Sequence, residues 1–108
     1  MKGQIVLVPF PFTDLTSIKL RPALILYEGE KDVVAAFISS RVDKPKPTDI
    51  IIDQEHPEFK KTGLKTTSIL KLDKVATLSK SLIVGEIGEV GAKLKKEINQ
   101  KIAKVYSL

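Results

Sequence analysis

Short runs of apolar and β-branched residues, separated by polar turns, recur along most of the chain. We expect one strand in each of the runs 5–10, 22–27, 33–38, 50–52, 68–78 and 83–90. The last stretch differs, because Leu94, Ile98, Ile102 and Val105 are spaced by four, four and three residues, as on one face of a helix. The pattern predicts a mainly β fold, a barrel or a sandwich, with a C-terminal α-helix.

Turn residues between the runs predict local features. Residues 27–32 form a polar turn that would join the second and third runs into an antiparallel hairpin. The segment 43–48, DKPKPT, is expected to be an extended and exposed connector, and 54–63 a second irregular loop. Gly63 is expected to adopt a positive φ, Ser79 to cap a short helical turn, and Gly91 to begin the C-terminal helix.

Length and composition narrow the class of protein. A chain of 108 residues predicts a single domain, 1–108, with a modest core that dimerisation would help to stabilise. The net charge of +5 and the pI near 9.5 favour a polyanionic partner or an acidic protein segment. With no cysteine and one histidine, we expect neither a metal site nor a cofactor. No run has the length of a signal peptide core or a membrane span, so we expect a cytoplasmic protein without membrane contact.

The two arginines are the first candidates for a functional site. Arg21 and Arg41 stand among eighteen basic residues, and a planar guanidinium holds a phosphate or carboxylate in a geometry that an ammonium cannot. Pro22 favours an extended backbone at Arg21, at the start of the second run. The third run is followed by Ser39 and Ser40, just before Arg41. If the two runs pair as a hairpin, Arg21 and Ser39 lie together.

Four segments carry a family resemblance that extends over nearly the whole chain. In order they are GQIVLVPFPFTDL, KLRPALIL, AAFISS and GLKTTSILKLDKVATLSKSLI. Together they resemble the PemK/MazF family of toxin endoribonucleases from toxin–antitoxin modules. The resemblance implies a small SH3-like β-barrel with a C-terminal helix, a homodimer, and metal-independent cleavage of single-stranded RNA such as mRNA. It also implies an acidic antitoxin as partner.

The resemblance assigns roles to two residues of this chain. The family's catalytic arginine, which opens the strand with the Arg-Pro pair, falls on Arg21, and the hydroxyl residue that ends the next strand falls on Ser39. There are two departures from the family pattern. Serine replaces the commoner threonine at position 39, and Gly3-Gln4 stands where the family usually has Gly-Asp. The missing carboxylate leaves room for altered activity or specificity.

Further polar residues are expected to contact RNA. They are Lys19, Ser40, Arg41, Lys65, Thr66 and Thr67. The first three flank the Arg21–Ser39 pair. The other three precede the longest strand, where their donors suit phosphate oxygens but would equally well complete a turn.

Several other side chains have a plainer interpretation. Phe10 and Phe12 could stack on unpaired bases, but we favour a role in packing. His56 precedes a proline among charged residues and is expected to be an ordinary surface histidine. The acidic residues within 53–58 are expected to be solvated.

RNA supplies its own nucleophile for cleavage, because its 2′-hydroxyl can attack the adjacent phosphorus. Arg21 would bridge phosphate oxygens and Ser39 would donate a hydrogen bond to the same phosphate. The family resemblance implies ends with a 2′,3′-cyclic phosphate and a 5′-hydroxyl. Two alternatives stay open: a non-catalytic toxin that binds DNA gyrase, since the same barrel resembles that of CcdB, and an RNA-binding module without activity, for which Gln4 is the only hint.

Overall fold

The computed structural model describes residues 1–9 and 19–108, and these form a mainly β fold that ends in a helix. The elements are β1 (Gln4–Pro9), β2 (Leu20–Glu28), β3 (Asp32–Ser39), β4 (Asp49–Ile52), η1 (Phe59–Thr62), β5 (Ser68–Ser79), η2 (Lys80–Leu82), β6 (Gly85–Glu89) and α1 (Ala92–Val105). The predicted fold class is therefore confirmed. The expectations for Phe10 and Phe12 concern residues outside the described ranges.

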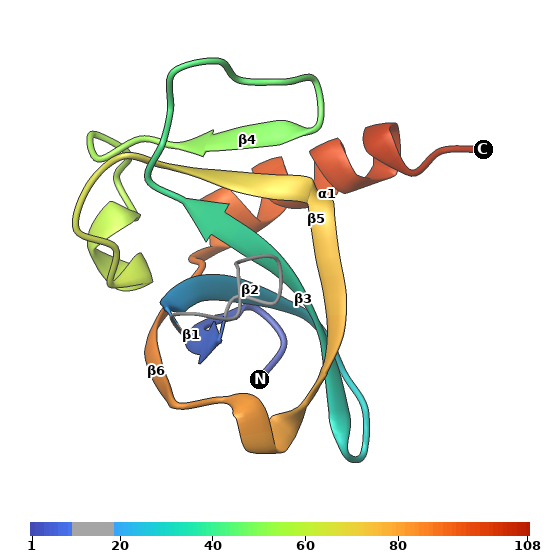
Figure 1. The fold of residues 1–108 in the computed structure, drawn as a ribbon. Helices are drawn as coiled ribbons and strands as arrows, with labels where there is room; N and C mark the ends of the chain where they lie inside the picture. The colour runs from blue at the N-terminus through green and yellow to red at the C-terminus, as the bar shows by residue number, and fades with distance from the viewer. Residues whose placement is uncertain (10–18) are drawn as a thin grey trace.

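The strands form one antiparallel sheet in the order β4-β5-β3-β2-β1-β6. The sheet curls into a half-barrel, with β4 and β6 at its two edges and α1 following as the last element (Figure 1). The predicted hairpin between β2 and β3 is confirmed. Glu28 pairs with Val33 across it, and the Gly29 amide donates to the Asp32 carbonyl at 2.8 Å.

Successive side chains of a strand point to opposite sides of the sheet. In the central strands, each side packs into its own core cluster, so both faces are buried. One core cluster packs beneath α1 and includes Ile5, Leu24, Ala36, Ile38, Leu70, Leu72, Leu94 and Ile98. The other lies on the opposite face and comprises Val6, Val8, Ala23, Ile25, Val33, Ala35, Phe37 and Leu78. Strands buried on both faces appear in the sequence as continuous apolar runs, as here.

The C-terminal helix follows its predicted apolar face. Leu94 and Ile98 are buried in the first core cluster, and Ile102 and Val105 pack against it. Gly91 is the N-cap, as expected, but a glycine offers no side chain to the exposed amides of the first turn. Ser79 is confirmed as the cap of η2, where its hydroxyl accepts from the Ser81 amide.

The expectation that the acidic residues within 53–58 are solvated is wrong for Glu58. Its carboxylate accepts hydrogen bonds from the amides of Leu94 at 2.7 Å and Lys93 at 3.2 Å, so a loop residue caps α1. A Cβ at Gly91 would lie 2.5 Å from this carboxylate, which explains the bare N-cap. Both bonds lower the pKa of Glu58, and the bond from the Leu94 amide has the larger effect.

The expectation of an exposed surface histidine at position 56 is also wrong. The His56 side chain is only 12% exposed, and its Nε2 lies 3.2 Å from Oε2 of Glu97 on α1. Its Nδ1 accepts from the Glu58 amide at 3.0 Å, so these partners select the tautomer with the proton on Nε2. The loop 54–63 is thus attached to the helix at two points.

No helix in the described part of the chain is long and apolar enough to cross a membrane.

Candidate functional site

The adjacent ends of β2 and β3 bring Arg21 and Ser39 to one cleft. The last pair of the β2–β3 ladder joins Ala23 to Phe37, and the same register continued by two residues sets Arg21 opposite Ser39. Both line a cleft of about 600 Å³. Its lining residues are Lys19, Arg21, Phe37, Ile38, Ser39, Ser40, Arg41, Lys71 and Lys74.

Three of the residues expected to bind RNA lie in the same cleft as the pair, namely Lys19, Ser40 and Arg41. The backbone amide of Arg41 donates to Oγ of Ser39 at 3.1 Å. This bond holds the Ser39 oxygen in place and leaves its O–H to donate to a ligand. The guanidinium of Arg21 and the fixed hydroxyl of Ser39 thus line the same cationic cleft.

Lys65, Thr66 and Thr67 are not among the residues that line this cleft. The Thr67 hydroxyl accepts from the Gln54 amide at 3.0 Å, and the Thr66 hydroxyl lies 3.5 Å from the Gln54 side-chain oxygen. These bonds join the segment before β5 to the loop that follows β4. They favour the interpretation that these residues complete a turn, and their contact with RNA stays a prediction.

Lys71 and Lys74 also line the cleft, although the sequence did not predict either of them there. Along the β3–β5 ladder, Ala36 pairs with Val75 but the next residue, Phe37, pairs with Lys71, so β5 contains extra residues at this point. Such a bulge bends a strand and redirects its side chains, and β5 turns sharply along its length (Figure 1). The only signal in the sequence was the interruption of an apolar run at Asp73-Lys74.

The ionisable residues that line the described cleft are all cations, from Lys19 and Arg21 through Arg41 to Lys71 and Lys74. A hollow lined by one sign of charge attracts the opposite sign, so this site suits an anion. Guanidinium groups and hydroxyls are donors that bind phosphate oxygens well. Within residues 1–9 and 19–108, no group of three or more acidic or histidine side chains is arranged to hold a metal ion.

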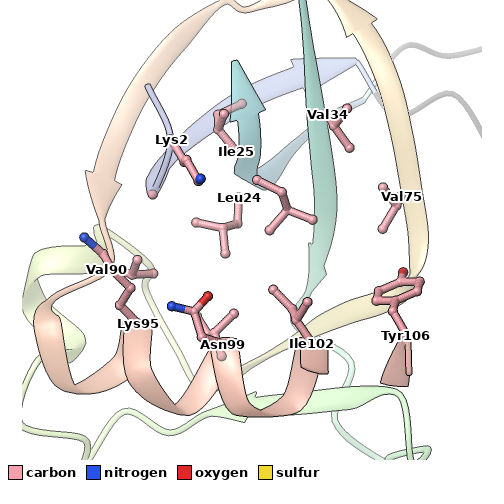
Figure 2. Close-up of a pocket in the computed structure, with 13 residues that line it drawn as sticks. Lys2, Leu24, Ile25, Val34, Val75, Val90, Lys95, Asn99, Ile102 and Tyr106 are labelled. Atoms are coloured by element: carbon pink, nitrogen blue, oxygen red, sulfur yellow. The ribbon is translucent and has the colours of Figure 1, made fainter. Parts of the chain in front are cut away.

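A second cleft, of about 780 Å³, lies between α1 and the sheet (Figure 2). Leu24, Val34, Val75 and Ile102 give it an apolar lining. Lys2 and Lys95 lie near one end in this view, away from the aromatic ring of Tyr106. This cleft is the larger of the two, but its lining is mainly apolar and includes two lysines, whereas the cationic cleft has five cations. We therefore assign the candidate site to the cationic cleft.

Comparison with known proteins supports both the fold and the family. Residues 1–106 match the family of PemK-like, MazF-like toxins of type II toxin–antitoxin systems. No curated protein sequence is significantly similar to the chain. Among solved structures, the Mycobacterium tuberculosis toxin MazF-mt6 is similar with a TM-score of 0.75 and 21% identity, covering 97% of each chain.

Two further structures come from mycobacterial species. An endoribonuclease in complex with its cognate antitoxin gives a TM-score of 0.74 and 23% identity, over 100% of this chain and 95% of that one. An endoribonuclease from mycobacterial species gives a TM-score of 0.71 and 23% identity, over 100% of this chain and 91% of that one. The curled sheet with its terminal helix is thus the fold of these proteins. Because the family match spans nearly every residue, the chain belongs to the PemK-like, MazF-like toxins of type II toxin–antitoxin systems.

Proposed function

We propose that this chain, as one domain, is a toxin that cleaves single-stranded RNA, with mRNA as its cellular substrate in the cytoplasm. The observation that carries the proposal is the shared cationic cleft of Arg21 and Ser39. Two structures of similar fold are themselves described as endoribonucleases. The alternative of a gyrase-binding toxin is not favoured, because the matching family is that of PemK-like and MazF-like toxins.

The proposed reaction is an internal transesterification. The 2′-oxygen of the RNA forms a bond to the neighbouring phosphorus, and the bond from phosphorus to the 5′-oxygen breaks. The 2′-hydroxyl gives up its proton and the departing 5′-oxygen takes one up. The products carry a 2′,3′-cyclic phosphate and a 5′-hydroxyl. Since the nucleophile belongs to the substrate, the protein has no water to activate, and we propose that it needs no metal.

The protein's task is then to stabilise charge and to fix geometry. Negative charge accumulates on the nonbridging phosphate oxygens, where the Arg21 guanidinium would place paired donors. Ser39, whose oxygen already accepts from the Arg41 amide, would donate its O–H to the same phosphate. Lys19 and Arg41 would hold flanking phosphates and so align the 2′-oxygen with the leaving oxygen.

We further infer two protein partners. The net charge of +5 and the cationic cleft suit an acidic antitoxin, which would block RNA by occupying the cleft. One of the similar structures is a complex with its cognate antitoxin. The second partner is another copy of this chain. The apolar cleft between α1 and the sheet would lie at the dimer contact, because a chain of 108 residues gains stability by covering such a surface.

Cleavage of a mixed-sequence single-stranded RNA in the presence of a chelator tests the proposal. We expect the wild-type protein to cut and to leave 2′,3′-cyclic phosphate ends. Arg21→Ala should react at least about a hundredfold to a thousandfold more slowly, the usual effect of removing one preorganised donor. Ser39→Ala should show a similar loss, whereas Ser39→Thr keeps the hydroxyl and should stay within about tenfold of wild type.

A matched control is Lys96→Gln, which removes one positive charge from an exposed position of α1 outside the cationic cleft. Its cleavage rate should equal that of wild type. Undiminished cleavage by Arg21→Ala would refute the proposed site. Tight binding of RNA by wild type without any cleavage would instead identify an RNA-binding module.

A further inference from the structure

A buried carboxylate lies behind one of the lysines of the cationic cleft. Asp49 of β4 and Lys71 of β5 are direct cross-strand partners, and Oδ1 of Asp49 lies 3.7 Å from Nζ of Lys71. Lys71 pairs in turn with Phe37 on β3. Since directly paired residues share a face of the sheet, this row runs from Asp49 into the cleft that Phe37 and Lys71 line.

The carboxylate of Asp49 lies in an unusual environment for a charged group. Its side chain is fully buried, and only Oδ2 is hydrogen-bonded, accepting from the Lys46 amide at 2.8 Å. Its Oδ1 is buried without a hydrogen-bond partner among the described residues. A buried charge is costly unless an opposite charge compensates it. The nearby ammonium of Lys71 supplies this compensation, and the attraction keeps that ammonium in place.

Lys71 can nevertheless reach a ligand. Its side chain is 25% exposed and lines the cleft with Arg21 and Ser39. The separation of 3.7 Å from Asp49 exceeds a hydrogen bond, so the N–H donors of the ammonium stay available to an anion. Lys71 and Ser39 lie on adjacent strands, two positions apart along the ladder. Diagonal neighbours of this kind are separated by roughly 7–8 Å, within reach of a long side chain.

We propose that Lys71 binds a backbone phosphate in the cleft and that Asp49 is its positioning residue. The identification of the ligand as single-stranded RNA rests on the proposed function. Lysine carries its charge on a flexible stem, and ordering that stem costs conformational entropy on binding. Asp49 reduces this cost by holding the ammonium close to its bound position beforehand. Because Asp49 also accepts from the Lys46 amide, it anchors the 43–48 connector as well.

The proposal makes a prediction opposite to that of simple charge counting. Asp49→Asn removes a negative charge close to the cleft, so Coulomb attraction alone would strengthen the binding of a polyanion. If Asp49 instead positions Lys71, the same substitution weakens binding. The amide oxygen of asparagine can still accept from the Lys46 amide, so the connector keeps its attachment.

The test measures binding of a labelled, mixed-sequence 2′-O-methyl RNA oligonucleotide, whose blocked 2′-oxygen prevents the proposed cleavage. Affinity is measured over a range of salt concentrations. For Lys71→Gln we expect about tenfold weaker binding, and a slope of log affinity against log salt that is smaller by about 0.7, the value for one phosphate contact on a single strand. Lys96→Gln, the matched charge change on α1, should leave the slope unchanged.

Asp49→Asn should also weaken binding and reduce the slope, although it makes the protein more positive. In the Lys71→Gln background, Asp49→Asn should change affinity by less than about twofold, because its effect passes through Lys71. Tighter binding by Asp49→Asn, or an unchanged slope for Lys71→Gln, would overturn the proposal. Thermal unfolding of each variant verifies the fold, and Lys71→Gln tests the phosphate contact even if Asp49→Asn fails to fold.

The two proposals can fail separately. If wild type does not cleave RNA but the slopes change as expected, the phosphate contact stands and the nuclease proposal falls. If RNA is cleaved and the slopes of the Lys71 and Asp49 variants match wild type, the nuclease proposal stands and the Asp49–Lys71 proposal falls.

Discussion

Gly63 shows how a single residue permits two elements to meet. Its φ is +72°, as expected from the sequence, and this backbone conformation is strained for residues with a Cβ. A Cβ at this position would also lie 1.9 Å from the carbonyl oxygen of Ile87 on β6. Gly88 makes the reciprocal contact, where a Cβ would lie 2.3 Å from the carbonyl oxygen of Lys61. The two glycines allow the backbone of η1 to lie directly on the edge strand.

Gly63→Ala is therefore expected to destabilise the protein by about 2–4 kcal/mol, from the strain of a positive φ together with overpacking against Ile87. Gly85→Ala is the matched control, because its φ is not positive and a Cβ there would have no atom within 4 Å. It should change stability by less than about 0.5 kcal/mol. Denaturant unfolding measures both, and equal stabilities for the two variants would contradict this account.

At the scale of elements, the contact between Glu58 and α1 couples helix stability to pH. Hydrogen bonds from the amides of Leu94 and Lys93 favour the ionised carboxylate, so the pKa of Glu58 lies below its ordinary value of 4.5. For a lowered pKa, the stabilisation is complete above the ordinary value and disappears as the pH falls through the pKa of the folded state. The helix cap should therefore be lost in acid.

Glu58→Gln should lower the melting temperature at pH 7, and its difference from wild type should shrink as the pH falls below about 4.5. Thermal unfolding of both proteins, repeated in steps of about one pH unit from about pH 3 to about pH 7, measures this difference in melting temperature. Glu28, whose pKa is lowered by hydrogen bonds from Lys80 and the N-terminus, contributes equally to both proteins. Glu55→Gln, in the same loop but exposed, is the control and should have the melting temperature of wild type at pH 7. A constant difference across this range would show that Glu58 acts without its charge.

The sequence predicted elements better than the contacts between them. Apolar runs and turn residues were sufficient for the strands and the β2–β3 hairpin, and this hairpin alone implied that Arg21 and Ser39 converge. The bulge in β5 was not predictable, because its position depends on how β5 pairs with β3 and not on local alternation. For that reason the sequence did not predict that Lys71 lines the cleft. The capping by Glu58 was missed because its partners lie 35 and 36 residues away.

At the scale of the whole molecule, the two clefts differ in chemistry. The cationic cleft is lined by residues such as Arg21 and Lys71, which belong to the face of the second core cluster. The apolar cleft lies on the α1 side, where Val34, Val75 and Tyr106 line it. If both proposals hold, one chain would bind an anion in the cationic cleft and associate with a second copy through the apolar cleft. This separation also allows the two activities to be tested independently.

If the apolar cleft is the dimer contact, a charge placed within it should dissociate the dimer. Val75→Glu would bury an unpaired carboxylate in the contact, at a cost of several kcal/mol, so the dissociation constant should rise by about a hundredfold or more. Val84→Glu is the control, since Val84 is 63% exposed and lies outside the cleft. Sedimentation velocity over a range of concentrations distinguishes monomer from dimer, and circular dichroism verifies the fold.

We expect wild type and Val84→Glu to sediment as dimers at concentrations where Val75→Glu is a monomer. A dimeric Val75→Glu protein would place the contact elsewhere on the surface, and a wild type that stays monomeric throughout would contradict the dimer itself. RNA binding by the Val75→Glu monomer adds a further distinction. If each cationic cleft is complete within one chain, the monomer should keep the phosphate contact of Lys71, and with it the same dependence on salt per chain.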